Sequence, residues 1–595
     1  MVRILRIDAA DTASGRDEEL GMSRWGRRVF GAFGACAAAL ALATQAQAAT
    51  YHVRPDGSDS NCNGLTNASD ASTTTSSCAF LTVQKAVNTW SGTGNTVLLH
   101  AGTINGSGST GSACVTSGPQ SPSAVYVGPT KGGAAGAYNV IKAANDGTVN
   151  LSANNGTCDL TVWIDAPYIQ IGGLGAGEGL TFPGDNTFAF AASFARAVGT
   201  VTFRNASHDG RVYGCNFLKN LSTNIPASDV GIGQIKANTG SGQTGYHFAG
   251  NTVRLGNIGK GIGIDNPGTI TAVNCDGTGD DSWPAGIIEN NVILHDSVDS
   301  TNNFRKQAFG GEMTKDVIYR NNYVRFGSST DVGTGAIGHE WYAFPLRASC
   351  RQTIQNNYIE VWSDSSDAFG VWNFKAPDGA GNTNTNQRYK VYNNTIYGKG
   401  KIGIYMNSCG GCEVRNNVVI GGVANGWPES VRDGACTTES SGPRGYNAYY
   451  NSAVPSVCST STNEGHNVAM ASAGMSLSGA RPVPFFQLTA GSALIGAGTI
   501  TGAPATDFDG VTRSIPYDIG ADEFGVLTTC GNGVRDTGES CDGGALGGST
   551  CVSLGFSGGT LVCTASCTFN TAGCDSAGNT PPPTVTNVKR TDQKP

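Results

Sequence analysis

The sequence has little of what long helices and membrane spans require. Of its 595 residues only 14% are charged and 6 are Met, whereas 85 are Gly. One stretch, residues 83–90, has apolar residues at helical spacing. After the N-terminal segment, no apolar run is long enough to cross a bilayer. These shortages argue against a helical bundle and against a membrane span, and the glycine content favours many short strands and turns.

The N-terminus carries the features of an export signal. Met22 is followed by three arginines and by an apolar run that begins at Val29, and the run ends at the small-residue triplet Ala46-Gln47-Ala48. The apolar run is too short for a membrane anchor. We therefore predict that residues 1–48 are a signal peptide with an upstream segment, that Met22 is the true start, and that the protein is secreted or held at the cell surface.

Positive charge is also scarce. Cleavage after Ala48 removes 6 basic and 5 acidic residues and leaves 32 basic and 40 acidic residues, a net charge of −8. Nucleic-acid binding needs a basic footprint, so we expect no nucleic-acid partner.

Cysteines are numerous for an exported chain, where disulfides persist. Removal of Cys36 with the signal leaves seventeen, and six of these crowd residues 530–574. The odd number predicts at least one unpaired or intermolecular thiol. A CxxC motif can also mark a zinc or redox site, but the one here lacks a second CxxC or a spaced His pair, which favours a local disulfide. The short-range pairs that we expect are Cys62–Cys78, Cys409–Cys412 and Cys436–Cys458.

A short phrase recurs through the middle of the chain. Residues 317–326 read VIYRNNYVRF, and close variants such as IIENNVIL and TIQNNYIEV occur at spacings of 23–40 residues. A repeat of this period indicates a solenoid. Runs of β-branched and aromatic residues between Gly and Asn turns favour strands. The second Asn of each phrase defines a column: Asn216, Asn251, Asn291, Asn322, Asn357, Asn394 and Asn417.

The Asn column has a structural explanation. Repeat units cannot bury an apolar face alone, so they stack with parallel strands about 4.8 Å apart. Asn tolerates the left-handed backbone of a sharp corner, and stacked Asn side chains can bond to each other. We predict an all-β fold, a right-handed parallel β-helix, in which these Asn residues are structural.

These features resemble the pectin-lyase-like superfamily of secreted β-helix proteins over residues 49–524. In that group a short helix, here residues 83–90, caps the first coil and protects its strand edge. The stretch at 485–524 resembles the closing segment of many bacterial β-helix proteins. Its acidic cluster is interpreted as end-capping turn chemistry rather than a metal site, and it comprises Asp507, Asp509, Asp518, Asp522 and Glu523.

Residues 525–574 form a separate predicted module with six cysteines. It resembles a Cys-rich repeat near the C-termini of exported proteins of myxobacteria. Such a short segment cannot supply an adequate apolar core, so disulfides would hold it together. We expect it to attach the protein to the cell surface or to act as a spacer. Residues 575–595 read as a Pro-rich disordered tail.

Function is expected where loops interrupt the coils, because loops on a rigid scaffold carry binding sites. The longest insertions run from 256 to 283 and from 326 to 344. The first contains CDGTGDD, with Asp265 upstream, and clustered oxygen ligands in a Gly-rich loop suit Ca²⁺, although a solvated turn explains them as well. The candidate metal ligands are Asp276, Asp280, Asp281 and Glu312.

Two further segments carry chemistry-bearing side chains, NNFRKQAFGGEMTKD and GHEWYAFPLRASCRQTIQNNY. β-Elimination on a uronate polymer needs a base for the proton next to the carboxylate and a cation to neutralise that carboxylate. The candidate catalytic residues are Lys306, Lys315, His339 and Arg347. The candidate substrate-binding residues are Arg305, Trp341, Tyr342, Arg351 and Lys375.

The piece LRASCRQTIQNNY resembles the arginine-bearing coil of the alginate lyase and chondroitinase-B-like polysaccharide lyases. That resemblance implies Arg347 as the leaving-group acid, Glu312 as a metal ligand and Lys315 as the base. Two features depart from the family: Ala348-Ser349 replaces His-Gly, and the separation between the lysine and the arginine is longer.

We therefore expect an exported, monomeric, carbohydrate-active β-helix protein that cleaves an acidic glycan by β-elimination, with Ca²⁺ as its cofactor. The first alternative is a non-catalytic adhesin or stalk, because this fold hosts both kinds of protein. The second is a glycoside hydrolase that uses paired carboxylates such as Asp364 and Asp367.

Overall fold

The structure is a computed structural model. It describes residues 48–70, 76–107, 114–115, 123–154, 157–188, 198–225, 231–239, 242–266, 275–276, 283–296, 305–332, 340–365, 367–374, 386–407, 409–433, 442–453, 455–456, 461–482, 485–524, 540–554, 556, 558–564 and 567–575.

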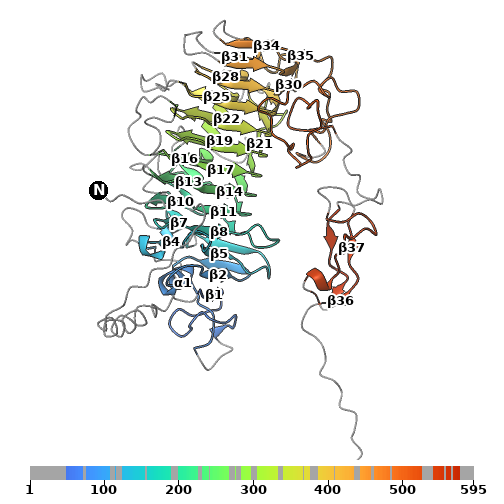
Figure 1. The fold of residues 1–595 in the computed structure, drawn as a ribbon. Coiled ribbons are helices and arrows are strands. Elements are labelled where there is room, and N and C mark those ends of the chain that lie inside the picture. Colours follow the sequence, from blue (N-terminus) through green and yellow to red (C-terminus); the bar gives the residue numbers. More distant parts are fainter. Residues whose placement is uncertain are drawn as a thin grey trace, which may run out of the picture. The chain divides into compact units, whose positions relative to one another are not determined.

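Short strands of the repeat stack into three parallel sheets (Figure 1). Sheet A has thirteen strands: β1 (Thr50–Val53), β2 (Thr96–Leu99), β5 (Asn139–Ala143), β8 (Ile169–Gly172), β11 (Arg211–Tyr213), β14 (Tyr246–Ala249), β17 (Gly286–Glu289), β20 (Ile318–Arg320), β23 (Thr353–Gln355), β26 (Lys390–Tyr392), β29 (Glu413–Arg415), β32 (Pro443–Gly445) and β34 (Thr462–Gly465).

Sheet B has twelve strands: β3 (Gly102–Asn105), β6 (Val149–Ser152), β9 (Thr181–Phe182), β12 (Asn216–Phe217), β15 (Thr252–Arg254), β18 (Val292–His295), β21 (Tyr323–Phe326), β24 (Tyr358–Trp362), β27 (Thr395–Lys399), β30 (Val418–Gly421), β33 (Ala448–Tyr450) and β35 (Val468–Ala469). Sheet C has ten strands: β4 (Ser123–Val127), β7 (Leu160–Ile164), β10 (Gly199–Asn205), β13 (Gly233–Thr239), β16 (Lys260–Asp265), β19 (Arg305–Glu312), β22 (Glu340–Arg347), β25 (Phe369–Phe374), β28 (Ile402–Met406) and β31 (Glu429–Asp433).

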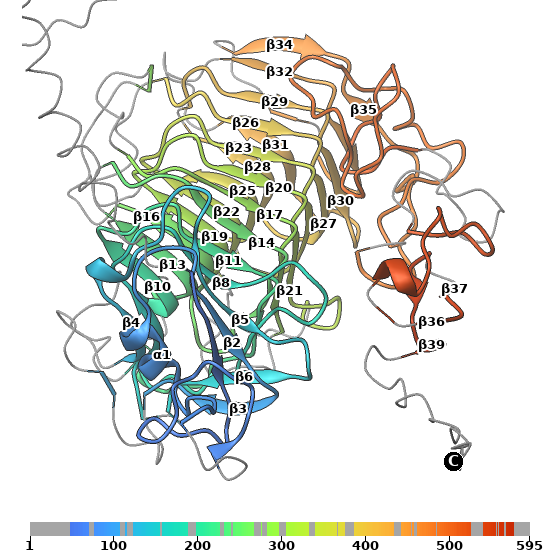
Figure 2. The same cartoon turned by 60° about the horizontal axis from the view of Figure 1, so that its bottom comes forward.

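From β10 to β33 the chain visits sheets C, A and B in turn, so each circuit is one coil of a solenoid (Figure 2). Side chains alternate between the interior and the outside along each strand. The interior holds one continuous apolar core in which like residues stack between coils, as Phe309 does on Phe344 with ring centroids 4.8 Å apart. The predicted fold class, an all-β parallel β-helix with an N-terminal helix and a disulfide-rich C-terminal region, is confirmed.

The predicted Asn column is a hydrogen-bonded ladder between sheets A and B. From Asn251 onward each side-chain amide donates to the carbonyl oxygen of the next Asn, at 2.9–3.0 Å, as far as Asn447. The backbone of Asn447 then donates to Asn467 at 3.0 Å. One predicted member is wrong: Cys215, not Asn216, occupies the ladder position, because its N–H donates to Asn251. Asn216 lies one residue further on, in β12.

The left-handed corner belongs to the first Asn of each phrase rather than to the ladder residue. Asn290, Asn321, Asn356, Asn393 and Asn416 all have φ between 50° and 55°. The sequence analysis assigned both roles to one asparagine, whereas the structure has them in two. The first Asn of each phrase turns the chain, and the second joins neighbouring coils.

Helix α1 (Val83–Thr89) closes the N-terminal end of the stack as predicted. The Thr82 side chain accepts a hydrogen bond from the N–H of Lys85 and so caps the helix. Its buried residues Val83, Ala86 and Val87 join the interior core. The structure has two 3₁₀ turns in the described residues, η2 (Pro129–Lys131) and η4 (Val552–Leu554).

Residues 485–524 pack on the outer face of sheet B. Tyr358 of β24 stacks on Phe486 with ring centroids 4.8 Å apart. Backbone groups of the segment also bond to the corner asparagines, since Asn393 donates to the carbonyl oxygens of Asp518 and Gly520 at 3.2 Å. The segment therefore covers one side of the stack.

Disulfides join described residues throughout the chain. Two predicted pairs, Cys62–Cys78 and Cys409–Cys412, are confirmed, and the predicted pair Cys436–Cys458 lies outside the described residues. Four other bridges join described residues: Cys114–Cys158, Cys275–Cys350, Cys541–Cys563 and Cys551–Cys574. Among the described cysteines Cys215 is free and buried, which fits the odd count. This density of bridges suits an oxidising compartment.

The described part of the Cys-rich region, between residues 540 and 575, contains two antiparallel pairs of very short strands. β36 (Gly558–Gly559) pairs with β39 (Cys574–Asp575), and β37 (Val562–Cys563) pairs with β38 (Phe569–Asn570). The last two disulfides lie here, as expected for a region with little apolar core. No helix in the described part of the chain is both long and apolar enough to span a membrane.

Candidate active site

The outer face of sheet C carries a row of charged side chains on four consecutive strands. Asp265 of β16, Glu312 of β19 and Arg347 of β22 are register partners, so they occupy equivalent positions on neighbouring strands. Their strand neighbours, such as Ile264 and Leu346, point into the core. We call the set the charged row, and it consists of Lys236, Lys260, Asp265, Glu312 and Arg347.

Two lysines share one carboxylate oxygen at the start of the charged row. The ammonium groups of Lys236, from β13, and Lys260 both bond to Oδ2 of Asp265, the latter at 3.2 Å. Two glycines make room for Lys260. A Cβ on Gly263 would lie 2.8 Å from Cδ of Lys260, and one on Gly310 would lie 2.6 Å from its Nζ. The glycines therefore allow the lysine side chain to lie flat against the sheet and reach Asp265.

Burial and charge shift the pKa values of this group. Burial lowers the pKa of Lys236, and the positive charge of Lys260 lowers it further, whereas Asp265 opposes the shift. Burial disfavours ionisation of Asp265, but the charges of Lys236 and Lys260 outweigh it and lower the pKa of this carboxyl. The single carboxylate cannot neutralise both ammonium groups, so the arrangement favours a neutral amine.

The other end of the charged row is open to solvent. Arg347 Nη1 lies 3.2 Å from Glu312 Oε1, and the two side chains are 17% and 28% exposed, against 0% for Lys236. The backbone N–H of Glu312 donates to Oδ1 of Asp265 at 3.1 Å, which joins the two halves. The partly exposed guanidinium can therefore meet an anionic ligand, while the lysines are more deeply buried.

Aromatic side chains lie on the same face in the following coils. Trp372 of β25 packs against Phe369 and Tyr342, with ring centroids 4.6 and 5.1 Å apart, and its register partner in β28 is Tyr405. Trp372 and Tyr405 are half-buried. Beside this cluster Arg305 pairs with Glu340, and the Tyr342 hydroxyl donates to that carboxylate at 3.0 Å. The partly exposed rings of Trp372 and Tyr405 suit stacking on sugar rings.

Several predicted site residues lie elsewhere. Lys306 and Trp341 point into the solenoid and are fully buried; the Lys306 ammonium donates to the carbonyl oxygens of Gly256 and Ile258 at 3.0 and 3.2 Å. Arg351 bonds to both carboxylate oxygens of Asp316 at 2.8 Å, away from sheet C. These positions separate Lys306, Trp341 and Arg351 from the charged row.

The remaining predicted residues fall near the row or outside the described part. Lys315 follows Glu312 by three residues, is half-buried and forms an isolated parallel bridge with Cys350. Asp364 and Asp367 each pair with a lysine, Lys399 and Lys401. The positions outside the described residues are His339, Lys375, Asp280 and Asp281.

The predicted Ca²⁺ loop stays a prediction for the same reason. Of its ligands, Asp276 is exposed and Glu312 is paired with Arg347. Neither belongs to a compact group of potential metal ligands among the described residues; the acidic group that does form consists of Asp507, Asp509 and Asp522. Carboxylate oxygens of this kind suit Ca²⁺.

Sequence reasoning missed Lys236 and Lys260. They lie in the strands QIKANT and KGIGID, which carry no Asn–Asn phrase. The available signal was a lysine in one predicted strand, Lys236, and an aspartate in the next, Asp265. In the sheet, Lys236 is the register partner of Gly263, two residues before Asp265. Recognising it requires the register of sheet C, and the insertion after Asp265 obscures that register.

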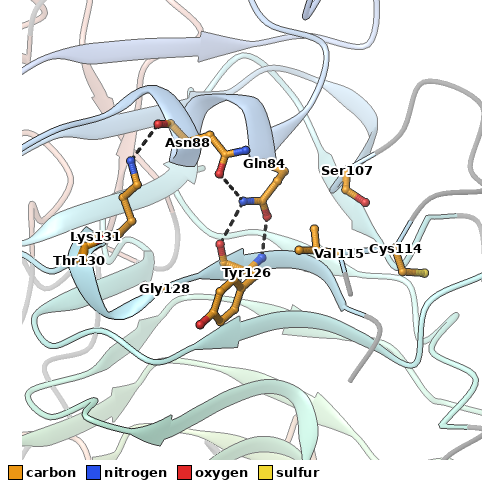
Figure 3. A pocket seen from close by; sticks show the side chains of 9 residues that line it. All are labelled: Gln84, Asn88, Ser107, Cys114, Val115, Tyr126, Gly128, Thr130 and Lys131. Atoms are coloured by element: carbon orange, nitrogen blue, oxygen red, sulfur yellow. Dashed lines mark hydrogen bonds between the residues drawn. The ribbon is translucent and has the colours of Figure 1, made fainter. Parts of the chain in front are cut away.

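Two surface pockets lie away from the charged row. One, of about 420 Å³, lies beside α1 and β4. Its polar groups bond to one another and to the backbone, which is a structural role. Gln84 bonds to Asn88 and to both backbone groups of Tyr126, and Lys131 donates to the carbonyl of Asn88 (Figure 3). The other, of about 440 Å³, lies on sheet A and is lined by charged residues that include Asp316, Arg351, Arg388, Lys390 and Glu413.

No family model matches the chain, and no curated protein matches it. Solved structures that resemble it include the pectate lyase Pel9A, at 14% identity and a TM-score of 0.44, covering 80% of this chain and 96% of that one. A rhamnogalacturonan lyase has 13% identity and a TM-score of 0.38, over 70% of this chain and 87% of the other. XylC in complex with xylose has 11% identity and a TM-score of 0.34, over 71% and 86%.

Proposed function

We propose that the protein is a polysaccharide lyase that cleaves a uronate-containing glycan by β-elimination on the outer face of sheet C. The observation that carries the proposal is the charged row, in which two lysines share one carboxylate, burial lowers the pKa of Lys236, and a partly exposed arginine lies beside them. The row holds three basic and two acidic side chains, whereas the mature chain has a net charge of −8. The basic excess is therefore local, as an anionic ligand requires.

Arg347 is the residue that meets the substrate. A uronate carboxylate bound by its guanidinium loses negative charge, so the proton on the adjacent carbon becomes more acidic and the enolate-like transition state is stabilised. Glu312 holds the guanidinium in place before the substrate arrives. Trp372 and Tyr405 continue the same face and supply ring surfaces for neighbouring sugars.

The base is a neutral lysine amine. Lys260 is the more accessible of the pair on Asp265, with its side chain 9% exposed, and a neutral amine can accept the proton. Loss of the glycosidic oxygen from the next carbon then forms the carbon–carbon double bond, and the leaving oxygen takes a proton. Lys315 is the alternative base, since it follows Glu312 on the same coil.

The test measures the unsaturated product by its ultraviolet absorbance. The mature protein is incubated with pectate, alginate and chondroitin, with and without Ca²⁺. Arg347→Ala should abolish the signal, whereas Arg320→Ala, which removes a sheet A arginine paired with Glu289, should not. Loss of activity in Lys260→Ala but not in Lys315→Ala assigns the base to the charged row, and the reverse result assigns it to Lys315. A flat trace on every acidic polymer would refute the lyase and favour the stalk.

A further inference from the structure

Three carboxylates meet in the segment that covers sheet B. Asp507, Asp509 and Asp522 each place a carboxylate oxygen within 4.8 Å of the others. Asp507 and Asp522 are buried and Asp509 is exposed. Two of them are contributed by one turn and the third comes from the end of the segment, so the group joins two parts of the chain.

The turn chemistry expected from the sequence accounts for only part of this group. Asp507 accepts backbone N–H bonds from Asp509, Val511 and Glu523 at 2.8–3.1 Å, which is the behaviour of a turn-forming aspartate. Asp522 accepts one such bond, at Oδ2 from the N–H of Leu488 at 2.6 Å, so turn hydrogen bonds engage this carboxylate less fully than that of Asp507.

A buried hydroxyl beside the carboxylates lacks a partner. The Tyr358 side chain of β24 is fully buried, and its hydroxyl makes no hydrogen bond in the described part of the chain. Its ring packs against Phe508, between two of the aspartates, with centroids 4.5 Å apart. Burial raises the pKa of Tyr358, and the negative charges of Asp522, Asp509 and Asp507 raise it further.

The guanidinium of Arg513 acts electrostatically on Asp507 and Asp522, but it bonds to neither carboxylate in the described part of the chain. Arg513 Nη1 bonds to Glu523 at 3.1 Å, and Nη2 donates to Asn356 and to the carbonyl oxygens of Gly520 and Ala521. Three carboxylates therefore share a small volume, and no ion pair joins any of them to a cation among the described residues. Crowding of this kind, at hard oxygen ligands, is what a divalent metal ion relieves.

We propose that Asp507, Asp509 and Asp522 bind one Ca²⁺ ion, with the Tyr358 hydroxyl as a further oxygen partner of the ion or of a water bound to it. Water would fill the other positions, because Ca²⁺ takes about 6–8 oxygen ligands. The ion would fasten the covering segment to sheet B. It lies on a different sheet from the charged row, so the proposal stands without the lyase activity.

The test uses the full mature chain, freed of metal by a chelator and then titrated with Ca²⁺ or Mg²⁺. Calorimetry should detect a Ca²⁺ site, and Ca²⁺ should raise the thermal midpoint through linkage. Asp509→Asn, which changes an exposed side chain, should weaken that site by about tenfold or more. The control Asp56→Asn, which alters an exposed aspartate paired with Arg54, should leave the affinity unchanged.

Tyr358→Phe separates a ligand role from a packing role. Without metal, removal of a buried hydroxyl that has no partner should leave stability unchanged or raise it. With Ca²⁺, the same variant should gain less in thermal midpoint than the wild type. The proposal is overturned if the wild type shows no response to Ca²⁺, or if Asp509→Asn and Asp522→Asn both bind and respond as the wild type does.

Discussion

The ammonium nitrogen of Lys260 lies 3.2 Å from Oδ2 of Asp265, and Lys236 from the preceding coil bonds to the same oxygen. One buried carboxylate thus serves two buried cations. Stability alone does not explain this cluster of three charges, because an apolar cluster of similar volume is often at least as stable. Buried ion clusters with shifted pKa values are instead frequent at functional sites.

Removal of the shared carboxylate should destabilise the protein. Asp265→Asn keeps the size of the side chain but leaves two buried ammonium groups without their counter-charge, and we expect a loss of about 3–5 kcal/mol in the free energy of unfolding. Urea denaturation of the purified mature protein measures it. Adding Lys236→Met to Asp265→Asn should recover part of the loss, and equal stability of all three proteins would show that the cluster is not electrostatically coupled.

The same cluster should set the pH dependence of activity. A lysine base works only when neutral, and the cluster of Lys236, Lys260 and Asp265 must lose one proton to supply a neutral amine. Burial lowers the pKa of Lys236 to about 8, so kcat/KM should rise with pH as the cluster loses that proton. Asp265→Asn removes the negative charge that stabilises that ammonium, and the rising limb should move to lower pH. The contrary result, a limb at the ordinary lysine pKa that Asp265→Asn does not move, would exclude the pair as base.

The repeat made the fold predictable, because each ladder contact joins positions that carry the same local phrase. Asn322 and Asn357 can be read directly from the sequence for this reason. Cys215 was missed because its coil spells GCN, which places the wrong residue in the column, and Asn447 was missed because Tyr446 replaces the first Asn of the pair. The prediction of the ladder therefore failed in the two coils in which another residue type takes the place of an Asn: Cys215 at the ladder position and Tyr446 at the corner.

The candidate site was less accessible to sequence reasoning. Glu312 and Arg347 stand in segments with several charged residues, so they were noticed, whereas Lys236 stands alone between apolar neighbours. It meets Asp265 only because two coils stack, 29 residues apart in sequence. Lys306 shows the opposite error, since charge alone predicted a site residue and the strand's alternation directs it inward.

The ladder itself suggests an improvement at Cys215. Its Sγ lies 3.3 Å from the carbonyl oxygen of Tyr213 and 3.9 Å from that of Ile171. These carbonyls are equivalent to the two that Asn291 contacts, which belong to Glu289 in its own coil and to Phe248 in the preceding coil. Cys215→Asn should therefore extend the ladder by one residue and leave stability equal or higher by about 1 kcal/mol.

Thermal and urea unfolding check this against two controls. Cys215→Ala removes the thiol without adding an amide and should lose stability. Asn322→Ala removes an existing ladder residue and should lose more stability, because the side-chain amide and the backbone N–H of Asn291 then both lack an acceptor. A Cys215→Asn protein as unstable as Asn322→Ala would mean that the first coils cannot take part in the ladder.

Lys306 provides a test of buried charge that does not depend on activity. Burial lowers the pKa of its ammonium from the ordinary 10.5 to about 7. Between these values the unfolded chain holds more protons on this lysine than the folded one, so its contribution makes stability rise as pH rises. Below about 7 the folded protein carries the full cost of the buried ammonium, about 3–5 kcal/mol.

Lys306→Met should abolish this dependence. The free energy of unfolding of the variant relative to the wild type should be most favourable below neutral pH and should fall by about 1.4 kcal/mol for each pH unit above it. The carbonyl oxygens of Gly256 and Ile258 lose a donor in the variant, which shifts the whole difference by a constant and leaves the slope unchanged. Lys142→Met, at a partly exposed lysine paired with Glu178, is the matched control for loss of a lysine that is not buried. A difference between wild type and Lys306→Met that stays constant with pH would mean that Lys306 titrates alike in the folded and unfolded chains.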